Sequence, residues 1–450
     1  MSRLIDVAEY KGIAVEKELV IDAGERYKQL LDDVRNKLNK EHSDIFLGSI
    51  FDSKVQDEAK DWIGVYVRDW IKKHGMIDKY STIEALIDAI SYDILDISIL
   101  KPLVNKRGVT DIFVDDYNYI YYDNFYEGRK PYEEKFKSDE EMLFIMKKIA
   151  AAAGKNLSAE EPAVNAQIGN NRFNVTLSKE KKGIGGKHYI SIRVHRDGEI
   201  TKKEIIASGM ITKEGKEFIE DVSRSKYISG MVAGATGTGK TTTLDSLILS
   251  SIETWERQII IQDEDELRAK FKRPQQNIVE LYTKKSPRKE TEYTIARLIE
   301  EIALRNKPDR IIVCEIRLGP DGAMLLYAFE TGHLGWTTIH AGSAKKTPKR
   351  LAKMIRTTRP NASDAEILDD IYGLLDIVIF IKLIRINGIE KRRITEIAEF
   401  TQDDDGKNGI RYIFKYNNKK DALERVGTIS EELTEKLQDA GIDPTRWVAV

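Results

Sequence analysis

The feature that most constrains this chain is GATGTGKT, which matches the pattern G-x-x-x-x-G-K-[ST]. In such a loop the glycine-rich backbone N–H groups surround phosphate oxygens, the lysine reaches the β- and γ-phosphates, and the final hydroxyl binds Mg²⁺. The apolar run ISGMVAG leads in as a strand, and TTTLDSLILSSI leads out as a helix whose N-terminus favours an anion. The pattern therefore predicts a nucleotide site, and an ordinary glycine turn is the weaker interpretation. The predicted contact residues are Gly234, Ala235, Thr236, Gly237, Thr238, Gly239, Lys240, Thr241 and Thr242.

Three further apolar runs follow this loop, and each ends in polar residues. They are QIIIQDEDEL, DRIIVCEIR and GWTTIHAGSA, separated by stretches of helical pattern. Alternating strands and helices are typical of an α/β domain with a parallel sheet, in which ligands bind at the carboxyl ends of the strands. We therefore expect the polar residues of all three runs to gather beside the phosphate-binding loop.

The charged groups at these strand ends are the predicted catalytic and nucleotide-binding residues. Glu315 is of the right type to polarise the attacking water, either as a general base or through a hydrogen bond. Asp263 and Glu266 are expected to hold Mg²⁺ through water. Thr241 and Glu315 are further candidates for Mg²⁺ contacts, direct or through water, and Arg317 is a candidate phosphate contact. One carboxylate at a strand end is more often a solvated loop residue, but three such strands after a phosphate-binding loop favour a shared site.

Two histidines, His333 and His340, lie seven positions apart around one of these runs. Zinc needs three or four ligands, and no cysteine or further histidine lies nearby in the sequence, so we predict no zinc site. Each residue could also be an ordinary buried histidine. The favoured interpretation is a γ-phosphate contact or relay that couples the state of the nucleotide to movement.

The length of 450 residues is enough for two or three domains. The stretch DEAKDWIGVYVRDWIKKHG repeats aromatic residues at a spacing of four and predicts a packed helix, so residues 1–104 are expected to be a helical region. Short β-branched and aromatic runs predict a β-rich domain at 105–198. A polar, lysine-rich stretch at 199–212 is a candidate linker. The remainder, 213–450, is the predicted nucleotide-binding domain with a C-terminal extension.

The overall charge gives no sign of a general attraction to nucleic acid or to an anionic membrane, because the formal net charge is −2. The single cysteine, Cys314, excludes an internal disulfide and suits a reducing compartment. No signal peptide is visible at the start of the chain. The longest apolar run, DIVIFIKLIRI, is too short to span a bilayer and is interrupted by Lys382 and Arg385. These observations favour a cytoplasmic protein.

The combination of GATGTGKT, IIIQDEDEL, KPDRIIVCEIR and TGHLGWTTIHAGSA resembles the secretion-ATPase superfamily. That superfamily drives type II secretion, type IV pili, archaeal filaments and type IV secretion. Its four signatures are a Walker A loop, an acidic Asp box, a Walker B strand ending in Glu, and a His box. VTDIFVDDYNYIYYDN looks like the start of its β-rich, PAS-like N-terminal domain. GIEKRRITEIAEF and LTEKLQDAGID are most similar to the branch that serves tight-adherence pili and conjugation-type secretion, and the resemblance covers about residues 105–445.

This resemblance implies a RecA-like P-loop NTPase domain with a mostly parallel sheet, preceded by a β-rich α+β domain. It also implies a homohexamer that binds ATP and Mg²⁺, with each nucleotide held between the two domains of one chain and contacted by a neighbour. By similarity, Arg172, Arg193 and Arg305 are expected near the phosphates. The implied partner is an inner-membrane platform or channel, to which the protein is recruited at the cytoplasmic face.

The chain departs from the family pattern at three positions near the site. Gln262 stands where the Asp box usually has Glu, Cys314 replaces a usual Walker B glycine, and Gly342 replaces the Asn usual in this branch. The paired CxxC zinc motif of type II secretion and pilus-extension ATPases is absent from the sequence. No retraction-type C-terminal motif is apparent, which makes a role in pilus retraction the weaker expectation.

The expected function is ATP hydrolysis that powers pilus assembly or the transport of protein or DNA. Two alternatives remain open from the residues. Basic segments such as KKSPRKE and AKKTPKRLAKMIR would suit a RecA-like DNA translocase, although they are also typical of solvated surfaces. The loss of a carboxylate at Gln262 would suit a nucleotide-gated assembly switch with little turnover. A small-molecule P-loop kinase has no use for the His box or the long N-terminal region.

Overall fold

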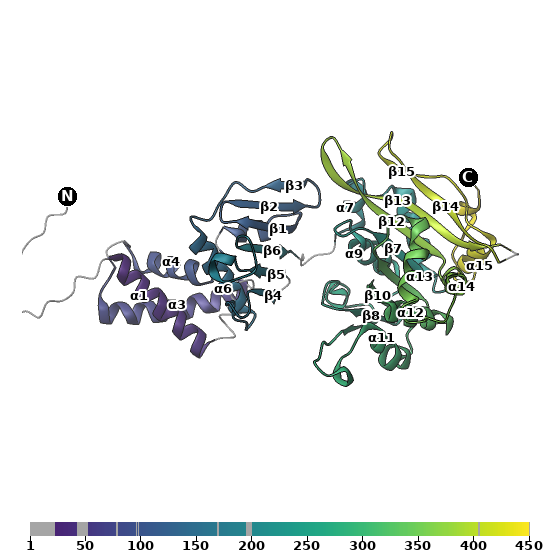
Figure 1. Cartoon of the computed structure of the whole chain (residues 1–450). Helices are drawn as coiled ribbons and strands as arrows, with labels where there is room; N and C mark the ends of the chain where they lie inside the picture. Colours follow the sequence, from purple (N-terminus) through teal and green to yellow (C-terminus); the bar gives the residue numbers. More distant parts are fainter. Residues whose placement is uncertain are drawn as a thin grey trace, which may run out of the picture. The chain divides into compact units, whose positions relative to one another are not determined.

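The computed structural model of the chain describes residues 23–42, 53–77, 80–95, 97, 99–168, 171–194, 200–403 and 406–449. The chain divides into two compact units (Figure 1). The first unit comprises Met1–Asn124 and Lys130–His195, and the second comprises Phe125–Arg129 and Arg196–Val450.

The first unit begins with helices. They are α1 (Ala23–Glu41), α3 (Ser53–His74), α4 (Ile83–Leu95) and α5 (Leu100–Asn105). In α3, Ile63 and Val67 are fully buried and Trp70 is nearly so, while the rings of Trp62 and Tyr66 stack at 5.6 Å between centroids. These residues share one face of the helix because they recur every three or four positions. The packed helix predicted from the aromatic spacing is present.

A six-stranded sheet completes the first unit, in the order β3-β2-β1-β6-β5-β4. Its elements are β1 (Val109–Asp116), β2 (Tyr119–Asn124), β3 (Gly128–Pro131), α6 (Asp139–Ala152), β4 (Ala163–Ile168), β5 (Asn171–Thr176) and β6 (Tyr189–Arg193). The runs expected as strands form β1, β2, β5 and β6. The sequence pattern did not predict α6, which starts where the hydroxyl of Ser138 accepts a hydrogen bond from the backbone N–H of Glu141. Helix α6 packs on β4 and β5.

The second unit is built on a nine-stranded sheet, in the order β15-β14-β13-β12-β7-β11-β10-β8-β9. The strands from β12 to β9 pair in parallel, and β12 to β15 form an antiparallel extension. Their bounds are β7 (Gly230–Gly234), β8 (Gln258–Gln262), β9 (Ile278–Tyr282), β10 (Arg310–Ile316), β11 (Gly335–Ile339), β12 (Ile377–Ile386), β13 (Ile389–Gln402), β14 (Asn408–Asn417) and β15 (Ala422–Arg425).

Helices cover both faces of this sheet, so the central strands read as continuous apolar runs. One face packs against α8 (Lys213–Arg224), the helical run α9–η2–η3 (Lys240–Ser251), α15 (Glu431–Gln438) and α16 (Thr445–Val448). The other face packs against α11–η5 (Ile295–Ala303), α12 (Gly319–Glu330), α13 (Thr347–Ile355) and α14 (Asp364–Leu374). Alternate residues of each strand therefore enter two separate cores.

Residues 200–212 differ from the linker predicted at 199–212. They contain α7 (Lys202–Ala207), whose N-terminus is closed by reciprocal hydrogen bonds between Thr201 and Glu204. Ile205, Met210 and Ile211 are buried in the same core as α8. Apolar residues hidden among lysines make this segment part of the second unit.

None of the helices in the described part of the chain combines the length and the hydropathy that a bilayer crossing needs. The apolar run around Phe380 forms strand β12, whose first five residues are buried.

Candidate active site

The phosphate-binding loop leaves the fully buried strand β7 and enters the helix that begins at Lys240. Gly237 and Gly239 have φ values of +75° and +102°, which side chains rarely tolerate. At Gly234 an added Cβ would lie 2.6 Å from the carbonyl oxygen of Ile381 on the neighbouring strand. The glycines are therefore required by the path of the loop as well as by close approach to phosphate.

Lys240 is nearly buried at the base of the loop, with 8% of its surface exposed. Its ammonium group donates to the carbonyl oxygen of Ala235 at 3.1 Å and lies 3.4 Å from Nδ1 of His340. The hydroxyl of Thr238 donates to the same carbonyl at 2.8 Å. Since an ammonium group can only donate, it fixes Nδ1 of His340 as the acceptor and leaves the proton of a neutral ring on Nε2.

His340 also contacts the predicted catalytic carboxylate, Glu315. Its Nε2 lies 2.6 Å from Oε1 of Glu315. Among the described residues, no hydrogen bond of good geometry reaches that oxygen. The other oxygen, Oε2, accepts from Nε and Nη2 of Arg317 at 2.9 and 2.7 Å. Glu315 is thus held between a histidine and an arginine at the end of β10.

Arg317 extends the network to the Asp box. Its Nη1 donates to Oδ2 of Asp263 at 3.1 Å, and the hydroxyl of Thr283 donates to Oδ1 at 3.0 Å. Hydrogen bonding to Glu315 is the main cause that raises the pKa of Arg317, and the negative charges of Asp263 and Glu266 add to it. The carboxyl ends of β7, β11, β10 and β8 are therefore joined in a single polar chain, as the positions of the strand-end residues predicted.

Gln262, the first departure from the family pattern, does not belong to this series of polar contacts. It is 1% exposed, its amide oxygen accepts from the backbone N–H of Leu267 at 3.2 Å, and the thiol of Cys314 lies 3.5 Å from the same oxygen. Burial, helped by nearby carboxylates, raises the pKa of the Cys314 thiol well above its ordinary value. Position 262 shapes the Asp-box loop, and the exposed acid that faces Arg317 is Asp263.

The donors at this edge fit a nucleotide with Mg²⁺. The loop provides backbone N–H groups and an ammonium group, and Thr241, Asp263 and Glu315 provide hard oxygen ligands. No cluster of three or more His, Cys, Asp or Glu side chains arranged for a metal occurs among the described residues. Mg²⁺ bound mainly through phosphate oxygens and water needs no such cluster.

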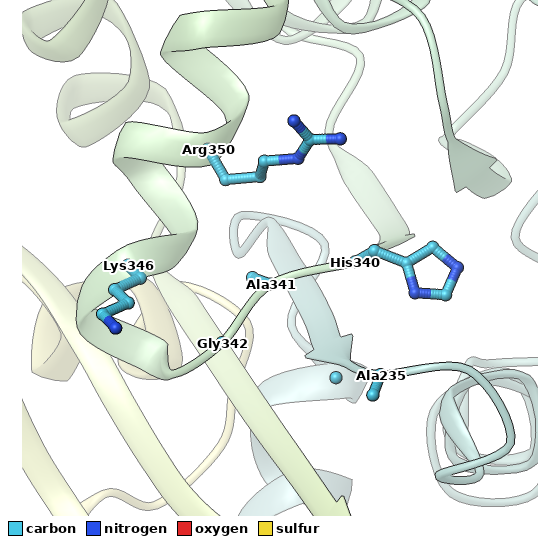
Figure 2. Close-up of a pocket in the computed structure, with 7 residues that line it drawn as sticks. Ala235, His340, Ala341, Gly342, Lys346 and Arg350 are labelled. Atoms are coloured by element: carbon cyan, nitrogen blue, oxygen red, sulfur yellow. The ribbon is translucent and has the colours of Figure 1, made fainter.

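A cavity of about 420 Å³ opens beside the loop (Figure 2). It is lined by Gly234, Ala235, His340, Ala341, Gly342, Lys346 and Arg350. Figure 2 shows the side chains of His340 and Arg350 extending to the same side of the segment that joins β11 to α13.

A family profile described as "Type II/IV secretion system protein" matches residues 94–432, which is most of the chain. The chain belongs to this family. Its members are ATPases, and the chain is an ATPase of the type II/IV secretion family.

Individual relatives are distant. An uncharacterized protein of Bacillus anthracis is 24% identical over 435 residues, covering 91% of this chain and 90% of that protein. The type IV secretion system protein VirB11 of Bartonella henselae is 28% identical over 313 residues, covering 60% of this chain and 83% of its own length. Among solved structures, the ATPase DotB of Yersinia pseudotuberculosis is 16% identical with a TM-score of 0.48, covering 74% of this chain and 79% of that one.

Two residues predicted for the site of this secretion-family ATPase lie at the opposite edge of the sheet. His333 precedes β11, where its Nδ1 is 3.2 Å from the hydroxyl of Thr331, and Arg305 lies in η6 (Leu304–Asn306), before β10 begins. The five residues of β11 separate His333 from His340 by about 16 Å at ~3.3 Å per residue. Strand direction therefore places the two histidines at opposite ends of β11. A phosphate contact by His333 stays a prediction.

The two arginines predicted from the first unit are neighbours within their own sheet. Arg172 on β5 pairs in register with Arg193 on β6, so both side chains stand on the same face. Arg193 donates to Asp111 at 3.1 Å. Their role at the nucleotide stays a prediction.

Three basic residues near the loop were not predicted as site residues. Arg392 on β13 donates from Nε to the carbonyl oxygen of Gly237 at 2.9 Å, while Lys346 and Arg350 line the cavity. All three occur in lysine- and arginine-rich segments, EKRRI and AKKTPKRLAKMIR, whose charge alone does not distinguish a solvated surface from a site.

Proposed function

We propose that the chain is a mechanochemical ATPase that works as a homohexameric ring on a secretion or pilus machine. The observation that carries this proposal is the polar chain from Lys240 through His340, Glu315 and Arg317 to Asp263. It links the lysine of the phosphate loop to the carboxylate that would polarise water. A site of this kind can sense the γ-phosphate and hydrolyse it.

In the proposed reaction, Glu315 polarises a water molecule whose oxygen forms a bond to the γ-phosphorus. The bond from that phosphorus to the bridging oxygen of ADP breaks, and the electron pair stays with ADP. The proton leaves the water toward Glu315, which Arg317 and His340 hold in place. Lys240 and the loop N–H groups stabilise the charge on the phosphate oxygens. Thr241 would hold Mg²⁺ directly and Asp263 and Glu315 would hold it through water, and the ion would supply further positive charge at these oxygens.

The residues at the opposite edge of the sheet support a ring. Arg305 and His333 lie too far from Lys240 to contact the nucleotide of their own chain. In a cyclic assembly each subunit presents a different surface to each neighbour. Arg305 would then reach the phosphates bound by an adjacent copy, and the first unit would supply Arg172 and Arg193.

The relatives support a membrane-associated transfer process. The Bartonella henselae relative is named a type IV secretion system protein, and a Rhizobium radiobacter relative, 29% identical over 217 residues, is named a conjugal transfer protein. We infer that the ring pushes on an inner-membrane platform or channel at the cytoplasmic face, and that its cargo is protein, DNA or pilin. Salt-dependent stimulation of hydrolysis by DNA would instead identify a DNA translocase.

The test is Glu315→Gln, which keeps the shape of the side chain but removes its ability to take a proton. We expect steady-state phosphate release to fall about 10²–10⁴-fold, with ATP affinity changed by less than about threefold. Glu330→Gln, at an exposed position at the end of α12, is the matched control and should leave turnover unchanged. Undiminished turnover in Glu315→Gln would remove Glu315 from the mechanism.

A further inference from the structure

Two basic residues border the cavity beside the phosphate loop. Lys346 and Arg350 stand one helical turn apart, at the start and on the first turns of α13, and both line the cavity with His340. No acidic side chain lines it. Within the described residues, neither cation forms a side-chain hydrogen bond or an ion pair. Two cations beside one cavity create a local attraction for anions. Figure 2 shows Arg350 on the same side as His340, and Lys346 on the other side of the segment that joins β11 to α13.

The cavity also borders the nucleotide site directly. Ala235 lines it, and the carbonyl oxygen of Ala235 accepts the hydrogen bond from Lys240. His340 lines it too, and the ring of His340 lies between Lys240 and Glu315. An anion in the cavity would therefore lie close to His340, which also contacts Lys240 and Glu315.

The size of the cavity suits a small hydrated anion. A phosphate has five heavy atoms and needs roughly 150 Å³ at the ~30 Å³ that a water molecule occupies in the liquid. The volume of about 420 Å³ leaves room for several water molecules beside it. Gly342 keeps the cavity open, because only Lys346 Cδ, at 3.6 Å, lies within 4 Å of the position that a Cβ would take.

We propose that this cavity binds inorganic phosphate after hydrolysis, with Arg350 and Lys346 as its ligands and His340 at its entrance. The proposal rests on the ATPase function argued above. The hydrolysed phosphate moves past His340 into the cavity before it leaves the protein. Arg350 is the main ligand, because its planar guanidinium can donate two parallel hydrogen bonds to phosphate and lies on the same side as His340 (Figure 2).

The test measures binding of inorganic phosphate to the full chain saturated with ADP and Mg²⁺, by equilibrium dialysis with labelled phosphate. We expect Lys346→Ala/Arg350→Ala to weaken phosphate binding by about tenfold or more. Lys349→Ala/Lys353→Ala removes two charges from the same helix at exposed positions outside the cavity, and should change binding by less than about twofold. ADP affinity should be the same in the wild type and in both double variants.

A second variant fills the cavity without changing its charge. Gly342→Leu places a side chain in the open space beside Lys346 and should weaken phosphate binding about as much as the double variant. Circular dichroism and ADP binding verify that each variant is folded. Wild-type phosphate binding in the double variant, or no binding to the wild type below about 10 mM, would overturn the proposal.

Three further outcomes separate this proposal from others. If Lys240→Ala abolishes phosphate binding while the cavity variants retain it, phosphate occupies the γ-position only and the cavity site is refuted. Turnover of the wild type is measured separately. If the wild type binds phosphate at the cavity but never hydrolyses ATP, the anion site is supported and the proposed motor function is refuted. If the wild type hydrolyses ATP and the cavity variants change neither turnover nor phosphate binding, only the cavity site is refuted.

Discussion

Gln262 and Cys314 are two departures from the family pattern, and the structure shows that they touch. They lie on the adjacent parallel strands β8 and β10, with the thiol 3.5 Å from the amide oxygen. A carboxylate at position 262 would be buried beside a thiol and close to Asp263 and Glu266. A neutral amide avoids burying that charge. The glutamine at position 262 is therefore explained by its local packing, and it does not favour a nucleotide-gated switch with little turnover.

Because Gln262 and Cys314 are in contact, we expect substitutions at these two positions to have non-additive effects on the free energy of unfolding. Gln262→Glu should lower the free energy of unfolding by about 1–3 kcal/mol at pH 8, because it buries a charge without a cation. Combined with Cys314→Gly, the change should differ from the sum of the single changes by about 0.5–3 kcal/mol. Urea denaturation of the four proteins measures this coupling. Strict additivity would show that the contact between the two side chains has no energetic role.

Among the elements, strand β13 and helix α15 meet through a buried carboxylate. Glu399 is 3% exposed, and its Oε2 accepts from the backbone N–H of Ser430 at 3.0 Å. Ser430 also caps α15 by accepting from the N–H of Leu433. Burial raises the pKa of Glu399 to about 7, only partly offset by the hydrogen bonds from Ser430. We therefore expect the stability of the folded protein to depend on the protonation of Glu399.

The sign of this dependence follows from the raised pKa. The folded protein holds the proton up to about pH 7, whereas the unfolded chain loses it near 4.5. Protonated Glu399 contributes fully to the free energy of unfolding below pH 4.5, and this contribution is lost as the pH rises through 7. The wild type should therefore lose up to about 3 kcal/mol relative to Glu399→Gln between pH 5 and pH 8. Urea denaturation at both pH values measures the difference, with Glu435→Gln on α15 as control; parallel pH profiles for wild type and Glu399→Gln would contradict it.

For the assembled molecule, the opposite placement of Lys240 and Arg305 allows a test of the ring by mixing variants. Lys240→Ala and Arg305→Ala should each have low turnover alone. When the two are mixed, about one interface in four combines an intact loop from one chain with an intact arginine from its neighbour, so turnover should reappear. Phosphate release as a function of mixing ratio measures this, alongside the native mass of the mixture.

A mixture of Lys240→Ala with Glu315→Gln is the matched control. Both residues serve the site of their own chain, so no interface in that mixture contains an intact site and turnover should stay low. Full turnover of Arg305→Ala alone would exclude that residue from the site. Equal recovery in both mixtures would contradict the assignment of Arg305 to a neighbouring site.

The sequence by itself determined the local chemistry of this protein. It predicted the phosphate loop, the apolar strands and the polar residues at the ends of those strands, Asp263, Glu315 and His340. Each of these features depends on residues adjacent in the chain. The parallel strands then bring these ends together, as Lys240, His340 and Glu315 show. Helix α6 and the segment around Ile205 were missed, because their apolar residues become recognisable only when a sheet packs against them.

Only the tertiary structure decided which charged residues share a site. His333 and His340 look alike in sequence, but strand direction places them at opposite edges. Arg392, Lys346 and Arg350 look like surface charges, but sheet pairing and helix packing bring them beside the loop. Gln262 looks like a lost catalytic acid, but burial next to Cys314 makes it structural. In each case the deciding quantity is the distance between groups far apart in the chain, which local patterns do not contain.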